Sequence, residues 1–167
     1  VTGVQTCALP ICPTTFEEFP AWSQALRREA HWQTLADLAS NNAPLFVCRC
    51  TRTEVVDGRC VRECHGLLDD FDSHANSHVV RLRSENEDTV LWGRFGPAYH
   101  LCSVSDDITF GVTHVIRGKD LEASTVIHRR LAQYLDAPGI RYAHHDLVVS
   151  EQGTKLSKSQ EIGRAHV

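Results

Sequence analysis

The chain has 167 residues, of which 42% are hydrophobic and 23% are charged, a composition typical of one globular domain with its own core. Its formal net charge is −4 with ten histidines counted as neutral, which excludes a generally basic, phosphate-binding surface. No apolar run approaches the roughly 20 residues of a membrane span, and no secretory signal is evident. We therefore expect a cytoplasmic protein with no membrane partner. We also expect a monomer, which composition and charge do not test.

The two ends of the chain differ in character from the rest. Residues 1–11 (VTGVQTCALPI) and 161–167 (EIGRAHV) resemble translated sequencing-adapter DNA, one in each orientation. On that resemblance we expect both segments to be artefacts and the natural protein to continue past both ends. Two genuine disordered termini are the alternative.

The first predicted element is a helix. Thr15-Phe16-Glu17-Glu18 has the Thr-x-x-Glu pattern of a capping box, and apolar residues at three- and four-residue steps then predict an amphipathic helix over about 21–40. Asn41-Asn42-Ala43-Pro44 should end it. Residues 45–47 (Leu-Phe-Val) follow as a short predicted strand.

After a segment without apolar periodicity, strand-like runs alternate with one further helix. Asp120 is the expected N-cap of a helix through Tyr134, which the turn residues Asp136-Ala137-Pro138-Gly139 should end. Strands around a crossover helix indicate an α/β fold. The predicted strands cover residues 78–83, 89–92, 99–104, 113–116 and 146–149.

Four cysteines form the clearest chemical signal. Cys48-Arg49-Cys50 is followed after nine residues by Cys60 and then by Cys64. Four thiolates from two short hooks can close a tetrahedron around Zn²⁺, and a bound ion would order a segment that has no core of its own. Disulfides or unliganded thiols are the alternatives, and a reducing compartment disfavours the former. Cys102, in the predicted strand over 99–104, is expected to be a core residue.

A second signal is the loop Lys155-Leu156-Ser157-Lys158-Ser159. Two ammonium groups on a loop can offset the charge that develops on a departing pyrophosphate, although a solvated basic turn is the commoner origin of such a string. Upstream stand Pro97-Ala98-Tyr99-His100-Leu101, the pair Asp106-Asp107, and the run from Gly111 to Asp120 (GVTHVIRGKD).

In order and spacing these strings resemble the second half of the catalytic domain of glutamyl-tRNA synthetases, with KLSKS at the place of the KMSKS signature of class I. The resemblance runs from about Glu17 to Ser159. Within this family the compact spacing of the cysteine hooks is similar to that of the short, tRNA-modifying members, the glutamyl-Q tRNA(Asp) synthetases. Cys60 stands where those members usually have Tyr. His100 stands where they usually have Gln, and it favours the longer enzymes.

The resemblance implies a class I synthetase Rossmann-like catalytic domain with an inserted zinc-binding subdomain. Its expected segments are a helical part (12–44), the zinc-binding insertion (45–76) and the second half of the catalytic domain (77–160), which ends in the KLSKS loop. The cofactors and substrates that it implies are Zn²⁺ on Cys48, Cys50, Cys60 and Cys64, ATP with Mg²⁺, glutamate and a tRNA.

Residue roles follow from the same resemblance. Tyr99 and Arg117 would hold glutamate, while Lys155, Ser157 and Lys158 would bind ATP, with the two lysines as catalytic residues. Asp106 and Asp107 would orient Arg117 or shape the pocket, and capping a turn is an equally good role for them. A half-buried aromatic and a strand-end ion pair are the plain alternatives for Tyr99 and Arg117.

The expected activity is ATP-dependent formation of glutamyl-adenylate and transfer of glutamate to queuosine in the anticodon of tRNA(Asp). Charging of the 3′ end of tRNA(Glu) is one alternative, and a non-catalytic zinc-hook module that binds RNA is another. The H-x-G-H signature of class I does not occur in this sequence, so we expect the chain by itself to be inactive and the activity to belong to the intact protein.

Overall fold

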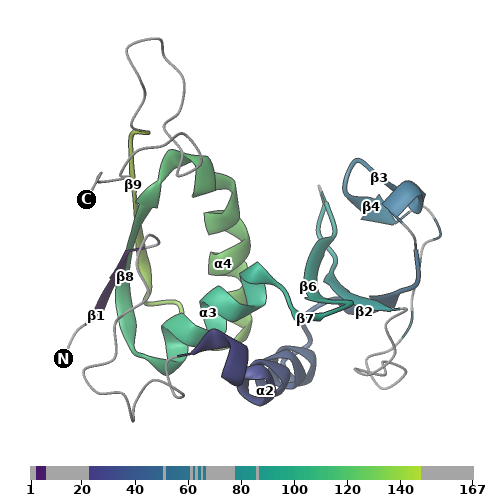
Figure 1. Cartoon of the computed structure of the whole chain (residues 1–167), viewed down its shortest axis with the longest axis horizontal. Coiled ribbons are helices and arrows are strands. Elements are labelled where there is room, and N and C mark those ends of the chain that lie inside the picture. The colour runs from purple at the N-terminus through teal and green to yellow at the C-terminus, as the bar shows by residue number, and fades with distance from the viewer. Residues whose placement is uncertain are drawn as a thin grey trace, which may run out of the picture.

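The structure is a computed structural model that describes residues 3–6, 23–50, 52–60, 62, 64, 66, 78–85 and 87–147. These residues form three sheets and three α-helices (Figure 1). One region is a parallel sheet with its helices, the other is an antiparallel sheet beside them, and the third sheet is a two-stranded hairpin. No helix in this described part is both long and apolar enough to cross a membrane.

The parallel sheet has the strand order β1-β8-β9, with β1 at Gly3–Thr6, β8 at Val112–Gly118 and β9 at Arg141–His145. Helix α4 (Glu122–Tyr134) connects β8 to β9 as a parallel crossover. It follows the 3₁₀ turn η4 (Lys119–Leu121), so it begins two residues after the predicted cap Asp120. β1 lies in the segment that the sequence sets apart as adapter-like, and it pairs in parallel with β8.

The antiparallel sheet has the order β2-β5-β6-β7, with β2 at Leu45–Cys48, β5 at Val79–Leu82, β6 at Thr89–Gly93 and β7 at Gly96–Pro97. The first three of these strands confirm predictions. The hairpin of β3 (Val55–Val56) and β4 (Arg59–Cys60) follows the short turn η2 (Arg52–Glu54) and stands at the far end of the molecule from β8 and β9 (Figure 1).

Helix α2 (Arg28–Ser40), preceded by the 3₁₀ turn η1 (Gln24–Leu26), and helix α4 both stop where the turn residues predict. After α2, Asn42 takes a φ of 58°, and after α4 Asp136 takes a φ of 57°. Ala43 then donates to the carbonyl of Leu38 at 2.9 Å, and Ala137 donates to that of Ala132 at 2.8 Å. Both ends are Schellman motifs, in which a left-handed residue lets the last carbonyls find partners before a proline prevents continuation.

One apolar core joins the two regions. Leu35 and Leu38 of α2 pack with Leu91 and Trp92 of β6 and with Leu131 of α4, all of them buried. Trp32 meets the ring of Trp92 edge-on, with centroids 5.1 Å apart. The shared side chains therefore join helices α2, α3 (Tyr99–Thr109) and α4 to the antiparallel sheet.

Two predicted strands are wrong. Residues 99–104 belong to helix α3 (Tyr99–Thr109), because the buried positions Leu101, Val104 and Ser105 follow helical spacing once the window is extended. Cys102 is thus a buried helix residue, as its predicted core role requires. The last strand, β9, precedes the predicted range of 146–149, and Asp146 and Leu147 are outside any strand. Residues 148 and 149, like the predicted capping box at 15–18, lie outside the described residues.

Candidate functional site

The four predicted metal ligands come together. The Sγ atoms of Cys48, Cys50, Cys60 and Cys64 all lie within 4.8 Å of one another, with 3.0 Å between those of Cys50 and Cys60 and 3.8 Å between those of Cys50 and Cys64. In a zinc tetrahedron with Zn–S bonds of about 2.3 Å the sulfur atoms are roughly 3.8 Å apart. Since all four are free thiols, their number, spacing and chemistry fit Zn²⁺.

The local fold brings the hooks together from separate strands. Cys48 ends β2, whereas Cys60 lies in β4, which turns back on β3 through Asp57 (φ 48°) and Gly58 (φ 75°). The amide of Val47 donates to the carbonyl of Gly66 at 2.8 Å, which ties the second hook to β2.

Groups outside the hooks fix their backbone. Asp88 accepts from the amide of Cys60 at 3.2 Å, and Arg83 donates to the carbonyl of Cys64 at 2.8 Å. Such partners orient the ligands of a metal site before the ion arrives.

The thiols influence one another. Burial raises the pKa of Cys50 strongly, and hydrogen bonds with its neighbouring thiols add to this shift. Burial would also raise the pKa of Cys60, but hydrogen bonds from Cys50 and from the backbone at Cys64 outweigh it and lower that pKa to about 6. The cluster therefore holds one thiolate readily, and a divalent cation would draw the remaining protons off, because only thiolates ligate zinc.

The predicted glutamate ligands, Tyr99 and Arg117, also lie together. Tyr99 begins α3, and Arg117 stands near the carboxyl end of β8, where open α/β sheets bind their ligands. The hydroxyl of Tyr99 accepts from Nη1 of Arg117 at 3.4 Å. The side chain of Tyr99 is 45% exposed, whereas Arg117 is 2% exposed, so the pair presents an accessible aromatic above a buried cation.

The walls around Arg117 come from α4 and β9. Nη1 lies 3.2 Å from Nδ1 of His128, and Nη2 donates to the hydroxyl of Thr125. The guanidinium carbon lies 5.1 Å from the ring centroid of Tyr142, a cation–π distance. His144, which is paired with Arg117 in the register of β8 and β9, lies 2.8 Å from the Thr125 hydroxyl.

The ionisable groups near Arg117 favour their neutral forms. Burial, with the positive charges of Arg117 and His100, lowers the pKa of His128 to about 3. Burial and the charge of Asp106 raise the pKa of Asp107 to about 7, although Arg117 opposes that shift. The positive charge of Arg117 is thus incompletely neutralised by the protein, which suits it to an anionic ligand.

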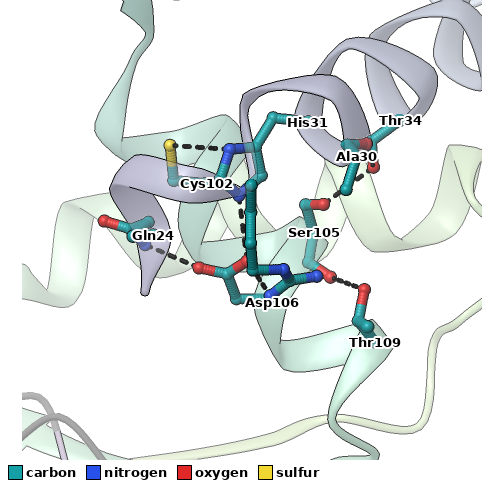
Figure 2. Close-up of polar contacts among 9 residues, drawn as sticks. Gln24, Ala30, His31, Thr34, Cys102, Ser105, Asp106 and Thr109 are labelled. Carbon is teal, nitrogen blue, oxygen red and sulfur yellow. Dashed lines mark hydrogen bonds and ion pairs between the residues drawn. The ribbon is translucent and has the colours of Figure 1, made fainter. Parts of the chain in front are cut away.

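Asp106 does not act on Arg117. Its carboxylate is an acceptor for residues that precede or begin α2, namely Gln24 at 2.7 Å, the guanidinium of Arg27, and Nε2 of His31 at 2.9 Å (Figure 2). Asp107, the neighbouring residue, is the one whose charge is felt by Arg117. The two aspartates therefore have different roles. Asp106 joins α3 to α2, whereas Asp107 interacts electrostatically with Arg117.

The same network contains Cys102, His31 and Asp106, whose residue types suggest a nucleophilic triad. Sγ of Cys102 is 3.9 Å from Nδ1 of His31, but burial and the charge of Asp106 raise the pKa of Cys102 to about 11. The thiol is therefore protonated at neutral pH, and the group is structural.

The residues predicted to bind ATP, Lys155, Ser157 and Lys158, lie outside the described residues, so their roles stay predictions. The site residues expected from the sequence did not include Thr125, His128, His144 or Tyr142. For Thr125 and His128 the sequence does contain a signal. They are two polar residues three positions apart on the buried face of α4, in line with Leu131.

Comparisons with known proteins agree on one family. Residues 80–162 match the family of the catalytic domain of class I tRNA synthetases for glutamate and glutamine. Curated relatives are glutamyl-Q tRNA(Asp) synthetases. That of Colwellia psychrerythraea is 30% identical over 89% of this chain and 56% of its own length. That of Salmonella choleraesuis is 35% identical over 81% of this chain and 52% of its own. That of Rhodobacter capsulatus is 37% identical over 56% of this chain and 35% of its own.

Solved structures show the same fold. A glutamate-tRNA synthetase from Elizabethkingia anophelis superimposes with a TM-score of 0.64 at 17% identity, over 83% of this chain and 37% of that one. A glutamate tRNA ligase from Elizabethkingia meningosepticum in complex with its amino acid gives 0.65 at 17% identity, over 89% of this chain and 37% of that one. The chain thus spans between 35% and 56% of the length of these relatives and solved structures.

Proposed function

Since this chain belongs to the family of class I tRNA synthetases for glutamate and glutamine, we propose that the protein activates glutamate with ATP and transfers it to tRNA. The favoured acceptor is queuosine in the anticodon of tRNA(Asp). The observation that carries the proposal is the buried guanidinium of Arg117, which lies at the carboxyl end of β8 beneath the exposed ring of Tyr99.

Arg117 and Tyr99 hold glutamate in this proposal. A planar guanidinium can bind both oxygens of a carboxylate, and the tyrosine hydroxyl adds one directional hydrogen bond. Burial of Arg117 strengthens its contact with the carboxylate, since few waters compete in a low-dielectric site. The neutral state of His128 leaves the positive charge of Arg117 to the ligand.

Glutamate and ATP react without a general base. A carboxylate oxygen of glutamate attacks the α-phosphorus of ATP, the bond to the bridging oxygen breaks, and pyrophosphate leaves with its negative charge. Lys155 and Lys158 offset that charge, and Ser157 contributes to ATP binding, while Mg²⁺ accompanies the nucleotide. A hydroxyl of the tRNA acceptor then attacks the acyl carbon and releases AMP. Positioning and charge stabilisation supply the acceleration.

Cys48, Cys50, Cys60 and Cys64 hold a structural zinc ion. The support for this is that two thiol hooks converge to within 4.8 Å, as a closed tetrahedral site requires. With four protein ligands the ion has no open position, so it supplies folding free energy and no chemical step.

The acceptor is tested with the product of the complete gene. The enzyme is incubated with labelled glutamate, ATP and a tRNA pool that contains queuosine, and the label is mapped on nuclease fragments. Label on the anticodon fragment of tRNA(Asp) is the expected result. Label on the 3′ end of tRNA(Glu) would show a charging enzyme instead. If tRNA binds but glutamate supports no pyrophosphate exchange, the protein is a non-catalytic RNA-binding module.

A further inference from the structure

Arg117 is held from two sides by chains of hydrogen bonds. One chain runs from Nη1 to Nδ1 of His128 at 3.2 Å, and then from Nε2 of His128 to Nδ1 of His100 at 3.1 Å. The other runs from Nη2 to the hydroxyl of Thr125, and then to Nε2 of His144 at 2.8 Å. Each chain thus begins at the guanidinium and ends at a histidine that is only partly buried.

The chemistry of arginine sets the direction of the first chain. A guanidinium has only donors, so Nδ1 of His128 must accept. A neutral imidazole that accepts on Nδ1 carries its proton on Nε2, and this proton is therefore donated to Nδ1 of His100. His100 in turn carries its proton on Nε2.

The second chain has no such fixed direction. The Thr125 hydroxyl accepts from Nη2 of Arg117 and lies 2.8 Å from Nε2 of His144, but a hydroxyl has two acceptor lone pairs and can either donate to that nitrogen or accept from it. Only His128 and His100 thus have tautomers that the donor-only character of Arg117 imposes.

His128 is built to stay an acceptor. Its side chain is 1% exposed, and ring centroids of Tyr99, His100 and Tyr142 lie 5.5, 5.2 and 6.3 Å from its own. Burial and the charge of Arg117 lower the pKa of His128 to about 3. A protonated ring would turn an N–H toward the guanidinium, and the two cations would repel each other.

We propose that His128 is a positioning residue for Arg117, supported by His100, and that it holds the guanidinium in one plane and one rotamer before glutamate binds. The inference rests on the proposed function, in which Arg117 binds the carboxylate of glutamate. A long arginine side chain otherwise loses rotamer freedom on binding, and a partner that fixes it beforehand reduces that cost.

The test compares two substitutions of one residue in the complete enzyme. His128→Leu removes the acceptor, whereas His128→Gln keeps an acceptor and a donor on a side chain of similar length. In pyrophosphate exchange we expect His128→Leu to raise the KM for glutamate about tenfold or more, since a hydrogen bond to a charged group is lost. The kcat and the KM for ATP should stay within about twofold, because the proposed function assigns ATP to Lys155, Ser157 and Lys158 and not to Arg117. His128→Gln should recover the KM for glutamate.

His114→Leu is the matched control, because His114 is exposed on the face of β8 opposite to Arg117. It should behave as the unaltered enzyme does. Equal effects of His128→Leu and His128→Gln, or a change in kcat alone, would overturn the positioning role. If Arg117→Met removes glutamate binding while His128→Leu does not, only the positioning role fails. If Arg117→Met leaves the KM for glutamate unchanged, the proposed function of Arg117 fails.

The tautomers give a readout that needs no activity and no altered protein. Nitrogen-15 NMR of the histidine rings should find the proton on Nε2 in His128 and in His100. The opposite tautomer at His128 would overturn the proposal even if His128→Leu fails to fold.

Discussion

Arg117 shows how single residues divide the electrostatic work of the site. Arg117 is a buried cation. The pKa of His128 is lowered and that of Asp107 is raised, and both shifts favour the neutral form of the side chain. An ionised carboxylate beside Arg117 would neutralise the positive charge that an anionic ligand needs. The cost of this arrangement falls on Asp107, whose Oδ1 is buried without a hydrogen-bond partner among the described residues.

Asp107→Asn should therefore change how stability depends on pH. Burial raises the pKa of Asp107 to about 7 from its usual value of 3.8. The stability that its neutral form contributes is fully present below pH 3.8 and is lost as the pH rises through about 7. We therefore expect Asp107→Asn to gain stability relative to the parent as the pH rises from 3.8 to about 7, by at most roughly 1.4 kcal/mol per pKa unit, and the gain to level off above that range. Urea unfolding at a series of pH values measures this, and a constant difference would contradict it.

Elements are fastened to one another by polar groups as well as by the apolar core. Helices α2 and α3 meet across the carboxylate of Asp106 and across the bond of 2.8 Å between the hydroxyls of Thr34 and Ser105 (Figure 2). A buried carboxylate with several donors makes only a small net contribution to the free energy of unfolding. Its removal is nevertheless strongly destabilising, because the donors are then left unpaired.

Asp106→Ala should lower the free energy of unfolding by about 3–5 kcal/mol, the usual effect of breaking a buried ion pair. Arg27 and His31 would lose their common acceptor inside the protein. Urea denaturation gives the value, with Gln33→Ala as the control, because it removes only an exposed bond of 3.0 Å to Asp37. A loss below about 1 kcal/mol, the scale of an exposed contact, would show that water replaces the carboxylate.

The β3–β4 hairpin offers a test of backbone conformation against packing. Gly58→Ala places a Cβ 2.7 Å from that of Glu87 at a φ of 75°, whereas Gly111→Ala meets nothing within 4 Å at a φ of 63°. Both alanines bear the cost of a left-handed φ, about 1 kcal/mol, and Gly58→Ala adds a clash. We expect only Gly58→Ala to weaken zinc binding as well, measured by competition with a chromogenic chelator. Equal zinc affinities in the two variants would mean that the turn does not shape the cluster.

At the scale of the molecule, the apolar core and the cysteine hooks depend on different sources of stability. Helices α3 and α4 and the inner strands share the apolar core, while the cysteine hooks form a small separate cluster with Phe46. So small a cluster cannot bury enough apolar surface to offset the entropy of its loops. The metal is the group that would supply the difference.

Removal of zinc should therefore act locally first. We expect a chelator to release one zinc ion per chain and to increase hydrogen exchange at β3 and β4 before it does so at β8 and α4. Cys60→Ser should reproduce this, and Cys102→Ser, in the buried interface of α2 and α3, should not. Uniform exchange across the chain after chelation would contradict a local role for the metal.

The sequence alone determined the features that depend on local chemistry. The convergence of the two cysteine hooks follows from the cysteine spacing. The ends of α2 and α4 follow from Asn-Ala-Pro and Asp-Ala-Pro, since a left-handed residue before a proline stops a helix wherever it occurs. The strands β2, β5 and β6 follow from dense β-branched and aromatic runs. The family followed from motif order, which the comparisons confirm.

Tertiary structure decided the rest, because those features depend on neighbours that are distant in the chain. Residues 99–104 look strand-like in a short window, but α3 forms because its buried face fits α2 and α4. The polar strand β9 exists because β8 offers it a partner. Neither sequence spacing nor composition could place His128 and Thr125 on either side of Arg117, or assign Asp106 to α2 and Asp107 to the arginine. The packing of α3 against α2, α4 and β8 fixes which of these polar groups meet.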